Sequence, residues 1–177
     1  STMISLNGLF LVNGQNTVKP QVLGQSETYL ATQNQPEVLS KRSLSLENRH
    51  ASDSVNKVFK DNILLNLAYL NGSVQDKEDI NWPSITSGIE ASFELKPGET
   101  FAFHDQVYPK YEDSLAVTTN TYFNASDGYL FSGFLYGDGV CHLASIINWV
   151  AQDAGLEVEV PKLHSIAKIP DIPDQYG

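Results

Sequence analysis

The single cysteine of the chain, Cys141, has the type and position best suited to covalent chemistry. It follows Gly137-Asp138-Gly139-Val140 in the first turn of a predicted helix. Unpaired backbone N–H groups and the helix dipole favour a thiolate at such a position. The same N–H groups suit a developing oxyanion, and the two glycines allow a substrate backbone to approach closely. The spacing therefore predicts a site for thiol acyl transfer.

Two features of the same segment favour an inert cysteine instead. Asp138, the predicted N-cap, carries a carboxylate that disfavours a nearby thiolate. Cys141 also stands between Val140 and Leu143 on a strongly apolar helix. Free cysteines are commonly buried as small hydrophobic side chains. The residues alone leave both interpretations open, a reactive thiol and a packed one.

Histidine is the expected partner of a catalytic thiol. His164 lies on a predicted strand after the helix, and a helix–strand pair can bring it within hydrogen-bond reach of Cys141. We therefore predict Cys141 and His164 as the catalytic pair. His142 is about 100° around the helix from Cys141 and is expected to point elsewhere.

Three further residues form the predicted substrate-binding set. Ser145 lies one turn beyond Cys141 on the same helix face, where its hydroxyl can bond substrate or the preceding turn. His104 follows a predicted turn and strand and is a candidate substrate contact. Gly139 is the third, through the access that it gives to a substrate backbone.

A third catalytic residue and a metal ion are both poorly supported. Asp171 and Asp174 are close in sequence to His164, but we interpret them as solvated loop charges. Cys141, His104 and His164 lack the paired spacing of zinc ligands. We therefore predict no metal site and no cofactor.

Two helices are predicted from apolar residues that recur at helical spacing. The first covers residues 53–71, and Asn71-Gly72 supplies its stop because glycine readily takes the left-handed conformation. The second runs from Val140 to Ala154, and Gly155 closes it. These helices must position the thiol, since Cys141 lies in the first turn of the second one.

The remaining elements are short predicted strands separated by turn residues. The predicted strands are Ile4–Val12, Thr17–Leu23, Thr28–Thr32, Val38–Leu46, Ile89–Leu95, Thr100–Phe103, Leu115–Phe123, Tyr129–Tyr136, Leu156–Val160 and Ser165–Ile169. This order predicts an α+β fold with a mixed or antiparallel sheet and two main helices. We expect a β-rich N-terminal arm or subdomain over residues 1–50 and a second domain over residues 51–177.

Composition narrows the classes of partner. With 41% hydrophobic residues, the 177-residue chain has the material for a packed core. A net charge of −10, with only 11 Lys and Arg, argues against nucleic acid and anionic membrane surfaces. No apolar run approaches the ~18 residues that span a bilayer, so we expect no direct membrane insertion of this segment. The sequence does not indicate an oligomeric state.

Four motifs, in order, resemble the VanW domain family over roughly residues 53–177. They are Leu95–Phe103, similar to its Pro-Gly-Glu-Thr-Phe-Ser-Phe stretch; Gly137–Cys141, similar to its triple-glycine, Ile or Val, Cys signature; Ala154–Glu157, its Ala-Gly-Leu-Glu; and His164-Ser165, its His-Ser pair. The segment Asn62–Gly72 also resembles the first helix of the family. The sequence departs from the family where Asp138 replaces the middle glycine and His142 replaces a glutamine.

The resemblance implies a bacterial protein at the extracellular face of the cell envelope, exported or membrane-anchored, of the kind found in vancomycin-resistance clusters. Some members are associated with L,D-transpeptidase activity on peptidoglycan stem peptides. This implies that Cys141 attacks a stem-peptide carbonyl, forms a thioester and passes the acyl group to a second stem. Two alternatives stay open, a Cys-His hydrolase of the same substrate and a non-catalytic wall-binding scaffold module.

Overall fold

The structure, a computed structural model, describes residues 3–10, 38–87, 91–104, 107–119, 121–133, 137–160 and 168–177. The strands are β1 (Met3–Phe10), β2 (Val38–Ser45), β3 (Ala91–Leu95), β4 (Thr100–Ala102) and β5 (Leu115–Thr118). The α-helices are α1 (Asp53–Leu70), α2 (Trp82–Thr86) and α3 (Val140–Asp153). Short 3-10 turns lie at Lys77–Asp79, Pro109–Ser114, Ala125–Asp127 and Asp174–Tyr176. The fold is α+β, which confirms the predicted class.

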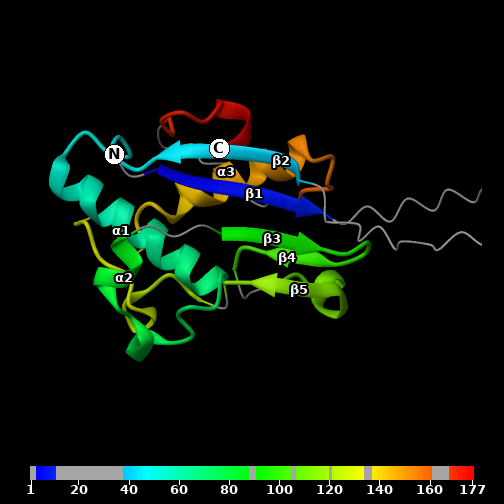
Figure 1. Cartoon of the computed structure of the whole chain (residues 1–177), viewed down its shortest axis with the longest axis horizontal. Coiled ribbons are helices and arrows are strands. Elements are labelled where there is room, and N and C mark those ends of the chain that lie inside the picture. The colour runs from blue at the N-terminus through cyan, green and yellow to red at the C-terminus, as the bar shows by residue number, and fades with distance from the viewer. Residues whose placement is uncertain are drawn as a thin grey trace, which may run out of the picture.

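Two strands near the N-terminus and one from the middle of the chain share one sheet, whose order is β2-β1-β3 (Figure 1). β1 runs antiparallel to β2 and parallel to β3. A second sheet pairs β4 with β5 in parallel. The boundary predicted between residues 50 and 51 stays a prediction, but strands on its two sides pair directly in the first sheet.

Helix α1 supplies much of the core because its apolar residues fill successive turns. Among the described residues, its side chains from Ile63 to Ala68 have a relative exposure of 0%. They pack in the same core as Leu143 and Ile146 of α3, which contacts α1, β1 and β2. Each fully buried aliphatic side chain contributes roughly 1.5–3 kcal/mol to folding. The two helices therefore fix each other's position, and with it the place where α3 begins.

Both long helices have the bounds that the spacing predicts, within a residue. The residue after α1 is Asn71, followed by Gly72 with φ of +76°. Asp153 ends α3, and Gly155 follows with φ of +76°. The short helix α2, which has Asn81 as its N-cap, is not among the predicted elements. No helix in the described ranges has the length and apolar character needed to cross a membrane.

Several predicted strands have a different outcome. Apart from Met3, the residues of β1 to β4 all lie within predicted strands. Of these four strands, β3 ends at the predicted residue and the others end one or two residues earlier. β5 stops at Thr118 rather than Phe123. Residues 129–133 hold a single bridge at Phe131, and residues 156–160 are not a strand. Directly after β5, the Thr119 hydroxyl donates to the Phe103 carbonyl at 2.8 Å. The strands predicted over residues 17–23 and 28–32, and most of 165–169, lie outside the described residues.

Candidate functional site

Cys141 is the second residue of α3, in the first turn as predicted, and the residue is exposed. The pKa of its thiol is nevertheless raised, first by burial of the sulfur among neighbouring atoms and then by the negative charge of Asp138. A contact from the backbone N–H of Cys141 itself acts in the opposite direction and is the smallest cause. The net shift is therefore opposite to the one predicted from the helix start. A reaction of this thiol near neutral pH requires a base.

The first turn of α3 uses part of its N–H groups internally. The N–H of Val140 donates to the Gly137 carbonyl at 3.1 Å, and the N–H of His142 donates to the Gly139 carbonyl at 2.9 Å. These bonds close the loop on the helix and make a rigid start for α3. They also reduce the number of donors that an oxyanion beside Cys141 can use.

The two glycines of the loop are required by contacts within the chain. A Cβ at Gly139 would lie 2.6 Å from the carbonyl oxygen of Phe59, on the backbone of α1. A Cβ at Gly137 would lie 2.7 Å from the carbonyl oxygen of Phe123. Both residues also have positive φ, +101° and +74°, which other residues rarely adopt. The contact of Gly139 with substrate stays a prediction, whereas its contact with α1 is a property of the fold.

The N-cap of α3 is Gly139, not Asp138 as predicted. The left-handed conformation of Gly139 starts the helix one residue later, and no side chain caps it. The Asp138 carboxylate instead accepts a hydrogen bond from the Ser132 hydroxyl. This bond ties the loop to the segment around Phe131.

Asn62 of α1 holds the same loop from the other side. Its side-chain nitrogen donates to the carbonyls of Leu130, at 3.1 Å, and Asp138, at 2.9 Å. Its side-chain oxygen accepts from the N–H of Leu130 at 2.8 Å. The sequence alone does not predict this role of Asn62. The available signal was an amide in the middle of an apolar helix face, where a buried polar group needs partners.

His142 and Ser145 of α3 are both buried and contact other residues of the protein. His142 is buried, and its ring meets the ring of Phe59 edge-on at 5.3 Å. It thus points away from the exposed Cys141, as expected from the helical angle. Ser145 is buried as well, and its hydroxyl donates to the carbonyl of Cys141 at 2.9 Å. Of the two roles proposed for this hydroxyl, the structure places it on the preceding turn.

His104 lies in an aromatic cluster that reaches the loop. Its ring meets those of Tyr122 and Phe123 edge-on, with centroids 5.4 Å and 5.2 Å away. Phe123 has a positive φ of 58°, and its carbonyl oxygen faces Gly137. His104 is therefore linked to the Gly137 end of the loop through one residue. Its contact with a substrate stays a prediction.

His164 lies outside the described residues, and so its pairing with Cys141 stays a prediction. Asp174 forms an ion pair with Lys168 at 3.3 Å. Over the described ranges, no group of three or more His, Cys, Asp or Glu side chains is arranged to hold a metal ion.

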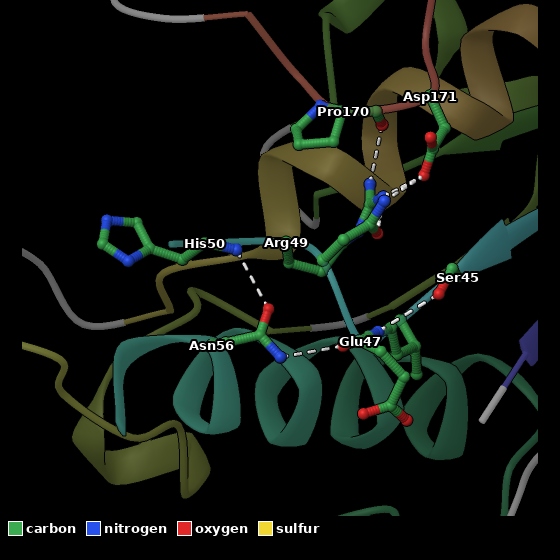
Figure 2. Close-up of polar contacts among 9 residues, drawn as sticks. Ser45, Glu47, Arg49, His50, Asn56, Pro170 and Asp171 are labelled. Carbon is green, nitrogen blue, oxygen red and sulfur yellow. Dashed lines mark hydrogen bonds and ion pairs between the residues drawn. The ribbon is translucent and has the colours of Figure 1, made fainter. Parts of the chain in front are cut away.

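Asp171 is an anchoring residue rather than a solvated loop charge. Figure 2 shows the buried Arg49 side chain reaching Pro170 and Asp171, which follow the segment of His164 in sequence. The guanidinium donates to the Pro170 carbonyl at 2.9 Å and to the Asp171 carboxylate at 2.5 Å. Asn56 of α1 fixes the next residue, because its side chain accepts from the N–H of His50. The connection between β2 and α1 thereby fastens the C-terminal segment.

Comparison with known proteins identifies no relative: no protein-family profile, curated protein or solved structure matches this chain.

Proposed function

We propose that this chain is a cysteine acyltransferase of the bacterial cell envelope, with peptidoglycan stem peptides as its substrates and Cys141 as its nucleophile. The observation that carries the proposal is the position of this thiol. It is exposed in the first turn of α3, directly after a loop whose backbone is bonded to α1. A nucleophile needs access and a defined orientation together, and this exposure and this fixed backbone support the proposal.

The proposed reaction has two steps through a thioester. In the first, Sγ of Cys141 loses its proton to a base and attacks the carbonyl carbon of the stem peptide. The C–S bond forms, the C–N bond breaks, and the terminal D-amino acid leaves with a proton on its nitrogen. In the second, the amine of another stem attacks the thioester, an amide forms, and the sulfur leaves as a thiolate. One proton of the amine returns to Sγ and any further one passes to solvent.

A base is essential because the thiol carries a raised pKa. His164 is the proposed base, on the grounds of its sequence position and the resemblance to VanW domains. His104 and Gly139 remain the proposed substrate contacts, whereas the Ser145 hydroxyl is bonded to the Cys141 carbonyl. The same resemblance is the ground for proposing the extracellular face of the envelope as the location.

Defined muropeptides test the proposal directly. We expect the wild-type protein to convert disaccharide tetrapeptides into 3-3 crosslinked dimers, detected by mass spectrometry. Cys141→Ser is the matched variant, since it differs by one atom and is expected to form no dimer and no thioester adduct. Crosslinking by Cys141→Ser at the wild-type rate would refute the role of the thiol. Trimmed monomers without dimers would indicate the hydrolase, in which water rather than an amine reaches the thioester.

A non-catalytic wall-binding module is the second candidate, and exposed aromatic side chains favour it. Tyr122 and Phe131 are 55% and 52% exposed, and aromatic side chains are enriched at interaction surfaces. Retention of the protein on purified cell-wall sacculi by wild type and Cys141→Ser alike, with no product from either, would support this module. Loss of retention in Tyr122→Ala would locate the binding surface.

A further inference from the structure

We infer that Asn62 is a positioning residue for Cys141: its carboxamide fixes the loop from which α3 starts and so sets the surroundings of the nucleophile. The inference deepens the proposed function and rests on it for its catalytic meaning. The effect of Asn62 on the reactivity of the Cys141 thiol can be measured without substrate.

The carboxamide of Asn62 is fully used and fully buried. The side chain is 0% exposed, and its nitrogen donates to two carbonyls, those of Leu130 and Asp138. Its oxygen accepts from the N–H of Leu130. One rigid group thus holds two chain segments, one on each side of residues 134–136, at a fixed separation.

Three more contacts complete this frame around the loop. The Ser132 hydroxyl bonds the Asp138 carboxylate, and the N–H of Gly137 donates to the Leu130 carbonyl at 3.3 Å, so the same two segments are also joined directly. One helical turn before Asn62, the backbone of Phe59 lies against Gly139 and leaves no room for the loop to move toward α1. The loop is therefore held on α1 by the hydrogen bonds of Asn62 and by packing on the backbone of Phe59.

The chemistry of Cys141 depends on this position. Burial and the charge of Asp138 are the two causes that raise its pKa, and both follow from where the loop lies. Without the Asn62 carboxamide, the Asp138 carbonyl and the Leu130 N–H each lose this part-buried partner, while the Leu130 carbonyl keeps its bond from the N–H of Gly137. We expect the loop to shift toward water, because polar groups left unpaired inside a fold are unfavourable. Such a shift hydrates the sulfur and moves the carboxylate of Asp138.

Two histidines of the described residues also lie near the helix start. His142 follows Cys141 in α3 and packs on Phe59, and His50 contacts the same ring at 5.7 Å. Among the charged groups that the structure describes, Asp138 is the one that acts on the thiol. If the pH profile of Cys141 alkylation changes in Asn62→Ala but not in a similar variant of α1, the change therefore results from a shift of the loop.

Asn66 offers that matched control on the same helix. It lies one turn beyond Asn62, is also 0% exposed, and donates to the Tyr129 hydroxyl at 3.0 Å. No hydrogen bond of Asn66 within the described residues reaches the loop before α3. Asn62→Ala and Asn66→Ala both remove a buried amide from α1, but only the first removes the hold on Asp138.

The experiment measures the rate at which iodoacetamide alkylates Cys141 in the native protein, as a function of pH. In Asn62→Ala we expect the midpoint of the profile to move to lower pH and the rate at pH 7 to rise several-fold. Ser132→Ala, which removes the other tie to Asp138, is expected to shift the midpoint in the same direction. Asn66→Ala is expected to keep the wild-type profile. Urea unfolding of each variant confirms that a cooperative fold is present.

The outcomes separate this inference from the proposed function. A wild-type profile in folded Asn62→Ala, or an equal shift in Asn66→Ala, would overturn the inference. If Asn62→Ala does not fold, Ser132→Ala decides by the same criterion. With muropeptides, Asn62→Ala is expected to lose about tenfold or more in transfer rate while its alkylation is faster, because misplacement impairs catalysis more than simple thiol chemistry. A shifted alkylation profile without any wild-type crosslinking would preserve the positioning role and refute the acyltransferase.

Discussion

Replacing Arg49 with alanine is expected to lower the free energy of unfolding by about 3 kcal/mol. The guanidinium makes three short bonds, to the Pro170 carbonyl, the Asp171 carboxylate and the Asn48 side chain, at 2.9, 2.5 and 2.6 Å. Its side chain is 0% exposed. Burial, the largest effect on this group, lowers its pKa, and the charge and hydrogen bond of Asp171 partly offset it.

The magnitude follows from these opposing contributions. Hydrogen bonds to a charged group contribute roughly 1.5–3 kcal/mol each, so three give a gross loss of several kcal/mol. Removing the buried charge recovers part of that loss, because the folded chain no longer desolvates a guanidinium. The Asp171 side chain is 48% exposed, so water screens its share of the attraction. A net loss near 3 kcal/mol remains, equivalent to a decrease in Tm of roughly 6–12 °C for a domain of this size.

Urea unfolding at low and high salt measures this effect, with two comparison variants. Asp171→Asn keeps an oxygen acceptor and tolerates the φ of +65° at this position, so it isolates the charge and is expected to lose about 1 kcal/mol. Lys60→Ala removes an ion pair with the half-exposed Glu47 and is expected to lose less than about 1 kcal/mol. The loss in Arg49→Ala should persist in ~1 M salt, which screens exposed pairs more than buried ones. A loss below about 1 kcal/mol, or its disappearance in salt, would refute the role of Arg49 as a buried anchor.

Three further outcomes test the site and the core. Asp138→Asn removes the second cause of the raised pKa of Cys141, so that pKa is expected to fall and alkylation near pH 7 to accelerate; an unchanged pH profile would contradict the role of this charge. Burial raises the pKa of Tyr69 to about 12, above its ordinary value of about 10, so the neutral phenol is favoured in the fold. Its contribution to stability is present below about pH 10 and is lost as the pH rises to about 12, which ultraviolet titration of tyrosinate and unfolding at each pH can follow. In Gly139→Ala the residue has a positive φ and its new Cβ overlaps the backbone of α1, so the free energy of unfolding in urea is expected to fall by about 3 kcal/mol. Gly155→Ala has a positive φ but open space around it, and is expected to lose about 1 kcal/mol. Equal losses in the two variants would show that the contact with α1 is unimportant.

Local patterns in the sequence were sufficient to predict the two long helices and the position of the Cys141 thiol in the second of them. The apolar spacing and the glycine stops predict α1 and α3 because helix formation depends mainly on residues three to four positions apart. The position of Cys141 in the first turn of α3 follows from the same pattern. The α+β class follows from the order of elements. These are all properties that neighbouring residues decide.

The electrostatics of the site could not be read from the same residues. The helix start alone favours a thiolate at Cys141, but burial and the position of Asp138 together raise its pKa. Both causes depend on how the loop packs against α1. The sequence shows that a carboxylate stands three residues before the thiol; only the packed structure decides which effect is larger.

Long-range pairing also decided what the single residues do. Asn62 and Asp138 are far apart in the sequence, yet one hydrogen bond of 2.9 Å joins them. Arg49 and Asp171 form their ion pair in the same way. Hydrogen-bond partners at such separations leave no periodic signal, because they are set by the docking of whole elements rather than by local conformation. The sequence therefore determined where the thiol stands, and the tertiary structure determined what holds it and how readily it loses its proton.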